Sequence, residues 1–214
     1  IISGPHIGIA TPLYKTPRRI YNTSNDYDVI DINSISDDYL PRTIYNFSNS
    51  LKEEYYALMP VSEDGQKYTK HYQLVCRRRL GLSGERTLIS AISPKNSNCL
   101  NSITSVIFDN YHDLLFISGI LSSIPYDGYI RFLGRTDLYF DGLSRIPLCK
   151  DTLKDEIELR ALVLNSVTKY YSELWQEVWK SEFRNVEWTK TDPRLKEYQF
   201  CNMNRSWSPN YALR

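Results

Sequence analysis

The sequence predicts an α+β fold: a mixed or antiparallel sheet packed against helices, then a long C-terminal helix and an irregular tail. Three observations predict this fold. Two β-rich runs at 71–79 and 86–93 are separated by the loop LGLSGE, which is typical of a hairpin. An apolar run with helical character covers 111–123. After Asp151, apolar residues recur at helical intervals.

The N-terminal part is expected to contain short strands joined by turns. Residues 1–21 are rich in Gly, Pro and Thr and are predicted to be extended or looped. Residues 29–32 form a candidate strand, and 36–43 indicate a turn that carries a proline. After the hairpin, 103–108 is predicted as a third strand.

The segment between the third strand and Asp151 is predicted to start helical and end extended. The helix at 111–123 is expected to continue through YDGYIRFLG at 126–134. The next residues, TDLYFDGLSRIPL at 136–148, are predicted to form a short strand, a turn and another strand. Residues 1–150 are therefore expected to form the α+β part of the molecule.

The C-terminal part is predicted to be one long amphipathic helix followed by a tail that wraps the body. Apolar side chains spaced by three, four and seven positions define its buried face: Leu153, Ile157, Leu164, Val167, Tyr171, Leu174 and Val178. From Phe183 onward the chain is polar and aromatic, with prolines that disfavour a helix. We expect 151–214 to belong to the same structural unit as 1–150.

The charge of the chain is nearly balanced, with 26 basic and 25 acidic residues, so total charge alone does not indicate nucleic-acid binding. Its distribution is more informative. The window 67–95 contains seven Lys or Arg residues and one acid, Glu85. A local basic patch on a neutral protein is a possible electrostatic footprint for a polyanion.

The four cysteines lie far apart, without a Cys-x-x-Cys pair, so they fit neither a structural zinc site nor a dense disulfide framework. They are interpreted as reduced thiols of a cytoplasmic protein. No apolar run approaches the roughly 20 residues that a membrane span needs, so no membrane partner is expected. The chain begins IISGPHIGIATPLYK, which indicates a piece of a longer polypeptide.

Known catalytic motifs are not found in the sequence. It contains no Gly-x-Gly-x-x-Gly, no Walker loop and no His-Glu-x-x-His. The histidines His6, His71 and His112 are scattered and are interpreted as structural or merely exposed. We therefore predict no catalytic centre, metal or cofactor in this chain. A nuclease with an unrecognised acid cluster stays a minor alternative.

The three arginines at 77–79 lie on a predicted strand, where alternate side chains face opposite sides. Arg77 and Arg79 are expected to share one face, which must be exposed or paired because burial of an unpaired arginine is costly. The planar guanidinium suits bidentate contact with guanine edges or phosphates. Arg86, just beyond the hairpin tip, can join them. The alternative interpretation is a solvated hairpin with surface salt bridges.

Four segments carry a resemblance to a known family. RRRLGLSGERTLISAISP at 77–94 resembles a segment of the C-terminal specificity regions of adenine-specific DNA methyltransferases, the TaqI-like and type IIG-like restriction-modification enzymes. Residues 114–148 resemble another hallmark of those target-recognition domains. ELRALVLNSVTKYYSELW at 158–175 is similar to a helix of larger members, and 4–18 resembles the lead-in to such domains.

The resemblance implies that a separate upstream domain of the same polypeptide binds S-adenosylmethionine and methylates adenine N6, whereas this chain recognises double-stranded DNA. Specificity then requires contacts to base edges, and positioning requires contacts to phosphates. The candidate base-contacting residues are Arg77, Arg79, Arg86 and Thr87. The candidate phosphate-contacting residues are Lys15, Arg18, Arg19, Lys67, Lys70, Arg78 and Lys95. The alternative function is a protein-interaction or assembly module of a phage-defence complex, with the basic hairpin solvated.

Overall fold

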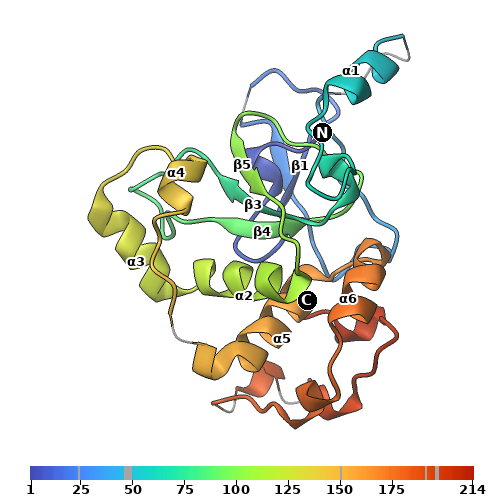
Figure 1. The fold of residues 1–214 in the computed structure, drawn as a ribbon, viewed down its shortest axis with the longest axis vertical. Coiled ribbons are helices and arrows are strands. Elements are labelled where there is room, and N and C mark those ends of the chain that lie inside the picture. The colour runs from blue at the N-terminus through green and yellow to red at the C-terminus, as the bar shows by residue number, and fades with distance from the viewer. Residues whose placement is uncertain (24, 46–49, 150, 191, 196–197) are drawn as a thin grey trace.

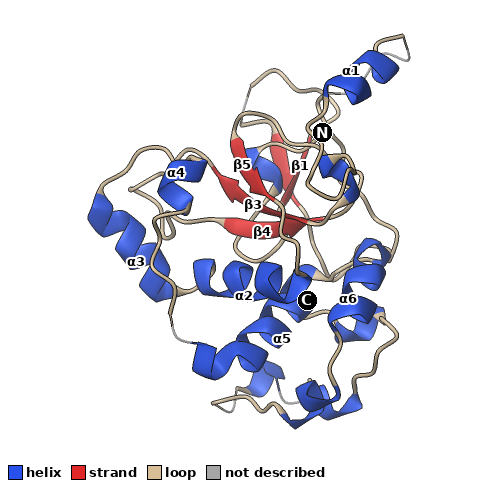
Figure 2. Ribbon diagram, in the orientation of Figure 1, coloured by secondary structure: helices blue, strands red, loops and turns tan. Residues whose placement is uncertain are grey.

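A computed structural model describes residues 1–214 except 24, 46–49, 150, 191 and 196–197. The fold is α+β, as predicted, with two small antiparallel sheets (Figure 2). The larger sheet has the order β4–β3–β5, formed by β3 (Gln73–Arg77), β4 (Ser90–Ser93) and β5 (Ile103–Val106). The predicted hairpin and third strand are therefore confirmed, although each strand is shorter than the apolar run that predicted it.

The smaller sheet pairs β1 (Lys15–Pro17) with β2 (Tyr27–Val29). The strand predicted at 29–32 therefore overlaps β2 at one residue only. Among the described residues between β2 and α1 (Lys52–Leu58) there is no further helix or strand, and α1 itself is short and exposed. The N-terminal loop packs on the large sheet, where Ile7 joins a cluster with Val75, Ala91 and Ile103.

The predicted helix at 111–134 is two helices, α2 (Tyr111–Leu121) and α3 (Ile124–Leu133). Asn110 caps α2, because its side-chain oxygen accepts a hydrogen bond of 2.8 Å from the amide of His112. Pro125 has no amide hydrogen and sits in the first turn of α3, where it favours a new helix rather than continuation of the old one.

The prediction of two strands at 136–148 is wrong. Residues 136–138 pair with the chain beyond the end of β3, and the following residues form a short helix, α4 (Phe140–Leu143). Gly142 lies within this helix beside the flexible end of the Arg135 side chain, whose Nη1 would be 2.6 Å from a Cβ atom added at this position. Only the start of the segment is extended, because 136–138 pair with the chain after β3, and the second predicted strand is absent from the described residues that follow α4.

The predicted long C-terminal helix is also wrong, because it is broken into α5 (Lys154–Asn165) and α6 (Ser172–Val178). The side chain of Asn165 accepts a hydrogen bond from the amide of Ile92 on β4 at 2.8 Å, which fixes the end of α5. Thr168 then adopts extended backbone angles. Val167 is fully buried beside Leu13. The apolar spacing persists through the break because the residues within it are buried against other segments.

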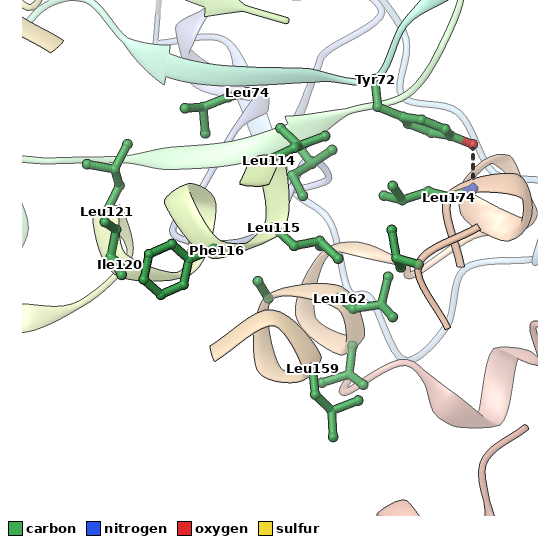
Figure 3. Close-up of a cluster of buried hydrophobic side chains, with 14 of the residues drawn as sticks. Tyr72, Leu74, Leu114, Leu115, Phe116, Ile120, Leu121, Leu159, Leu162 and Leu174 are labelled. Carbon is green, nitrogen blue, oxygen red and sulfur yellow. Dashed lines mark hydrogen bonds between the residues drawn. The ribbon is translucent and has the colours of Figure 1, made fainter. Parts of the chain in front are cut away.

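Helix α2 lies between the sheet and α5, so the core forms in two layers on either side of it (Figure 1). Figure 3 shows part of this cluster: Tyr72 and Leu74 lie on the sheet side of α2, and Leu159 and Leu162 of α5 lie on its other side. The hydroxyl of Tyr72 accepts a hydrogen bond from the amide of Leu174 at 3.3 Å. Gly119 allows α2 and α5 to approach closely, because a Cβ atom there would lie 2.5 Å from Cγ2 of Ile157.

The tail is irregular, as predicted, and crosses α5 and α6. The indole nitrogen of Trp175 donates to the carbonyl of Asn204 at 2.9 Å, and that of Trp207 to the carbonyl of Ser166 at 3.0 Å. Short 3₁₀ turns occur in the tail and elsewhere in the chain: Gly4–His6, Tyr68–Lys70, Asp151–Leu153, Lys169–Tyr171, Ser181–Asn185, Pro193–Leu195, Phe200–Asn202 and Pro209–Tyr211.

Candidate nucleic-acid interface

Beyond the end of β3, residues 78–80 of the arginine hairpin pair with residues 136–138. The amide of Leu80 donates to the carbonyl of Thr136 at 3.0 Å, and the amide of Leu138 donates to the carbonyl of Arg78 at 2.8 Å. Arg79 and Asp137 stand opposite each other in this antiparallel pair. The arginine segment is thus held in extended form by the residues that follow α3, at the end of the sheet where α3 and α4 lie (Figure 1).

Asp137 contacts two arginines. Its carboxylate accepts a hydrogen bond from Nη1 of Arg79 at 3.2 Å and lies 3.7 Å from Nε of Arg78. Arg78 also donates to the hydroxyl of Tyr139 at 2.6 Å, with its guanidinium 5.2 Å from the centre of that ring. These contacts restrict the conformations of both arginines, so less conformational entropy is lost when either binds a ligand.

Asp127 of α3 also contacts two arginines. It lies 3.0 Å from Nε of Arg131 and 3.5 Å from Nε of Arg86. Its carboxylate also accepts hydrogen bonds of 2.7 Å from the amides of Thr87 and Leu88. Burial alone would raise the pKa of Asp127, but these amides, together with the two guanidinium groups, hold its pKa below the usual value. Asp127 therefore ties the hairpin to α3.

Every residue of the hairpin tip from 81 to 85 is exposed. Nη2 of Arg131 donates to the carbonyl of Gly84 at 2.5 Å, which anchors the base of this loop to α3. A Cβ atom on Gly81 would meet nothing within 4 Å, so the loop backbone is open to close approach by a ligand. Leu82 is 48% exposed at the tip.

We call the segments 78–88 and 127–145 the arginine end of the sheet. They carry six arginines and four carboxylates, which leaves a surplus of two positive charges on a chain with net charge +1. The most exposed of its ion-paired arginines is Arg79, with 74% of its side chain accessible, against 35% for Arg131 and 33% for Arg135. The arginine end is thus modestly cationic, and its arginines are held in defined positions.

Arg77, predicted to contact bases, points into the protein. Its guanidinium donates to the carbonyl of Gly4 at 2.9 Å and to that of Ile7 at 2.6 Å, and it lies 5.7 Å from the ring centre of Tyr14. Burial lowers the pKa of Arg77 from its usual value. In this structure the side chain fastens the N-terminal loop to β3.

Arg86 and Thr87, also predicted to contact bases, are likewise engaged with the protein. Nη2 of Arg86 donates to the carbonyls of Ser122 and Ser123 at 2.7 and 3.1 Å, beyond the end of α2. Thr87 is only 2% exposed, and its hydroxyl donates to the carbonyl of Gly81 at 3.1 Å. Both side chains hold the returning half of the hairpin in place.

The predicted basic window divides between the two ends of the sheet. Lys70 lies just before β3 and Lys95 just after β4, and these strands are antiparallel, so both lie at the end opposite Arg78. Lys67 belongs to the same neighbourhood. We call these three residues the lysine end. Lys70 is exposed and donates to the side chain of Asn96 at 3.2 Å.

At the lysine end, the ammonium groups of Lys67 and Lys95 contact acceptors within the protein. Nζ of Lys67 donates to the carbonyls of Ala57 and Met59 at 3.2 and 3.1 Å. Lys95 forms an ion pair with Glu173 of α6, and its Nζ lies 5.1 Å from the ring centre of Tyr72. These contacts tie local segments together.

The remaining predicted phosphate contacts lie in or beside the small sheet. Nζ of Lys15 is 5.1 Å from the ring centre of Tyr14. Arg18 is paired with Asp28 at 2.9 Å. Arg19 is exposed. Neither the charge count nor strand alternation indicated that this group belongs to a separate sheet.

The residues that sequence reasoning missed are Asp127, Arg131, Arg135, Asp137 and Tyr139. One signal was available for part of this set: Asp127 and Arg131 are four residues apart, the spacing of an ion pair on a helix. The pairing of 78–80 with 136–138 had no local signal, because it joins segments far apart in the chain.

A possible relay of Ser62, Asp64 and His71 lies at the lysine end. Nε2 of His71 is 3.0 Å from Oγ of Ser62 and 3.4 Å from the carboxylate of Asp64. Because both groups meet the same ring nitrogen, the imidazole is not placed between them as it is in a serine-histidine-aspartate triad. The arrangement fits a local hydrogen-bond cluster.

Comparisons with models of protein families, with curated proteins and with solved structures found no match to this chain. Within the described ranges, every helix is too short or too polar to cross a lipid bilayer. Inferences about function therefore depend on the residues and geometry of this chain.

Proposed function

We propose that this chain recognises a specific sequence in double-stranded DNA, as the target-recognition domain of an N6-adenine DNA methyltransferase in a restriction-modification or phage-defence system. In this proposal the catalytic domain lies upstream in the same polypeptide and binds S-adenosylmethionine. The chain itself positions the duplex and does not transfer the methyl group.

The observation that carries the proposal is the pair of aspartates that each contact two arginines. Asp127 and Asp137 come from α3 and from the segment that follows it, and together they contact four guanidinium groups. Fixed guanidinium groups suit both phosphates and the O6 and N7 atoms of guanine. Such preorganisation lowers the entropic cost of binding.

Within this array, Arg79 is the candidate for reading a base. Its side chain projects from the paired segment 78–80, and its contact with Asp137 uses one of its donor nitrogens. Arg78, Arg131 and Arg135 are candidates for phosphate contacts, together with the backbone of the exposed hairpin tip. Arg77, Arg86 and Thr87 support the loop in this proposal.

The sequence resemblance supports the same function. RRRLGLSGERTLISAISP contains the arginine hairpin, and YDGYIRFLG contains Asp127 and Arg131. Two segments of the resemblance therefore meet at the arginine end, where Asp127 joins them. A shared DNA-recognition role accounts for residues that are far apart in sequence and adjacent in space.

A second candidate function is a protein-interaction module. It is favoured by the apolar side chains exposed near the arginine end: Ile124, Phe132, Tyr139, Phe140 and Leu148. Clusters of this kind frequently mark interaction sites. The positive charge among them favours DNA over a protein partner.

A selection from a random duplex library tests the proposal. The immobilised chain is incubated with the library at low salt, and the retained DNA is sequenced. We expect enrichment of a defined motif, with binding that weakens as salt concentration rises. An Arg79→Ala variant should lose this enrichment. The matched control is Arg194→Ala, which should keep it, because Arg194 is also exposed and paired with a nearby aspartate, Asp192. Failure to retain or enrich any duplex would contradict the proposal.

A further inference from the structure

The most exposed large apolar side chain in the described part of the molecule is Phe132, at 88%. It lies one residue before the end of α3. Ile124 and Gly128, eight and four residues earlier, are also exposed, so they share its side of the helix. The opposite side carries Ile130, which is fully buried. Contact with water is unfavourable for a phenyl ring, so a ring this exposed favours a role at an interface.

Two arginines lie close to Phe132 in the chain, and both are paired with aspartates, Arg131 with Asp127 and Arg135 with Asp141. Arg131 precedes it, and Arg135 follows three residues later. Gly134 between them adopts left-handed angles, with φ of 63°, and turns the chain from α3 into the segment that pairs with Arg79. The ring therefore stands at the edge of the arginine end, on the element that carries Asp127.

Helix α3 is rigidly attached on the side away from Phe132. Asp127 holds the amides of residues 87 and 88, and the hydroxyl of Tyr126 donates to the carbonyl of Pro147 at 2.8 Å. Ile130 anchors the same helix in the core. A side chain on such an element can press on a ligand without the helix yielding.

We propose that Phe132 is a wedge that inserts between base pairs of the duplex bound by the arginine end, opening one stacked step beside the target adenine. The inference rests on the DNA-recognition function proposed above and adds a residue that deforms the duplex. An exposed aromatic ring on a surface with a surplus of positive charge complements a polyanion whose interior is built of stacked rings. Proteins that kink DNA insert apolar side chains, phenylalanine among them, between base steps.

In the proposed reaction, the wedge would help to move the target adenine out of the base stack. An enzyme that modifies adenine N6 must take the base out of the stack, and unstacking is energetically unfavourable. A ring that occupies the opened step stabilises the deformed duplex. The guanidinium groups of Arg79 and Arg131 belong to the same arginine end, so their contacts with the duplex supply binding free energy that offsets this deformation.

The test uses the full polypeptide that contains this chain, together with a DNA duplex that contains the sequence this polypeptide methylates. In that duplex, 2-aminopurine replaces bases near the target adenine. The fluorescence of 2-aminopurine rises when its stacking is lost. We compare the unmodified protein with Phe132→Ala, with Phe132→Trp and with Leu58→Ala. Leu58 is the matched control, because it is 84% exposed on α1.

We expect a fluorescence rise with the unmodified protein and with Leu58→Ala, loss of the rise with Phe132→Ala, and its recovery with Phe132→Trp. Phe132→Ala should also bind the matched duplex more weakly than the unmodified protein does. A mismatch at the opened step should restore this binding, because that step is already weakened. These results would support the wedge.

Three outcomes would overturn the wedge and are distinguishable. An equal rise with Phe132→Ala would remove the wedge and leave DNA recognition intact. Unchanged DNA deformation, with loss of association between this chain and a separately expressed upstream domain, would assign Phe132 to a protein interface. Absence of duplex binding by every version, including the unmodified protein, would remove the proposed function and the wedge together.

Discussion

The two ends of the three-stranded sheet both carry cationic side chains but hold them differently. At the arginine end, Asp127 and Asp137 each contact two arginines, and Asp127 is almost fully buried. At the lysine end, each lysine meets a single local acid, an amide or main-chain carbonyls. Arginines that share a carboxylate are held in fixed positions relative to one another. The lysines have separate partners, so their positions are independent of one another. Shared anchoring therefore distinguishes a candidate binding surface from ordinary surface charge.

The largest effect is expected from Asp127→Ala. It would leave two arginines and two amides of the hairpin without their buried acceptor. Breaking a buried, hydrogen-bonded charge pair costs about 3–5 kcal/mol, so urea denaturation should show a loss in the free energy of unfolding of this size. The matched change at the lysine end, Glu173→Ala, should cost about 0.5 kcal/mol or less, because its side chain is exposed. Similar losses for both variants would contradict the contrast between the ends.

The pH dependence of stability sharpens the same comparison. The pKa of Asp127 is lowered in the folded protein, so its stabilising contribution is fully present above its unfolded pKa of about 3.9. That contribution is lost as pH falls through the lower, folded pKa. As pH falls from 7 to below the folded pKa of Asp127, the free energy of unfolding should therefore decrease more for the unmodified protein than for Asp127→Asn. Urea denaturation at each pH measures both free energies. Parallel pH profiles would show that Asp127 does not supply this difference.

A smaller effect is expected on DNA affinity from Arg79→Ala. A good bidentate contact to a base discriminates by about 1–3 kcal/mol, so binding to the selected duplex should weaken by about 5- to 150-fold. Lys95→Ala should change affinity little, because Lys95 is committed to Glu173 and to aromatic rings. Titrations by fluorescence anisotropy measure both constants. A larger loss for Lys95→Ala would move the interface to the lysine end.

The smallest effect is expected from Tyr139→Phe, which removes the hydroxyl that accepts a hydrogen bond from Arg78. A single such bond contributes about 0.5–1.5 kcal/mol, and the exposure of Tyr139 places the expected loss of stability in that range or below. Tyr170→Phe, away from the arginine end, should cost less, because its hydroxyl lies 3.4 Å from the carbonyl of Asp38. An equal loss for Tyr170→Phe would show that the Arg78–Tyr139 contact adds no particular stability.

Patterns within short stretches of sequence correctly predicted the hairpin, the third strand and α2. The hairpin, the third strand and α2 follow from β-rich runs, from the Gly-Ser loop and from an apolar run with helical character. The break between α5 and α6 could not be predicted in this way. Val167 is buried beside Leu13, a residue from the other end of the chain, so its apolar character continued a helical pattern that the backbone does not follow.

The candidate site was predicted in part. Arg78 and Arg79 lie in the array, whereas Arg77 and Arg86 bind main-chain carbonyls and Thr87 is buried. Strand alternation assigns faces but cannot say which face meets solvent, because the N-terminal loop covers the face of Arg77. The aspartates of the array come from a segment some fifty residues further along the chain. Only tertiary structure brings them to the hairpin.

The most direct test of the central claim is single-molecule sequencing of methylated DNA from cells that express the full parent gene. Unmodified, Arg79→Ala and Arg194→Ala versions are compared at equal expression. We predict a sequence-specific N6-methyladenine mark that survives Arg194→Ala and is lost or relaxed in Arg79→Ala. A mark unchanged by Arg79→Ala, or no mark from a well-expressed unmodified parent, would contradict the assignment of the arginine end to DNA recognition.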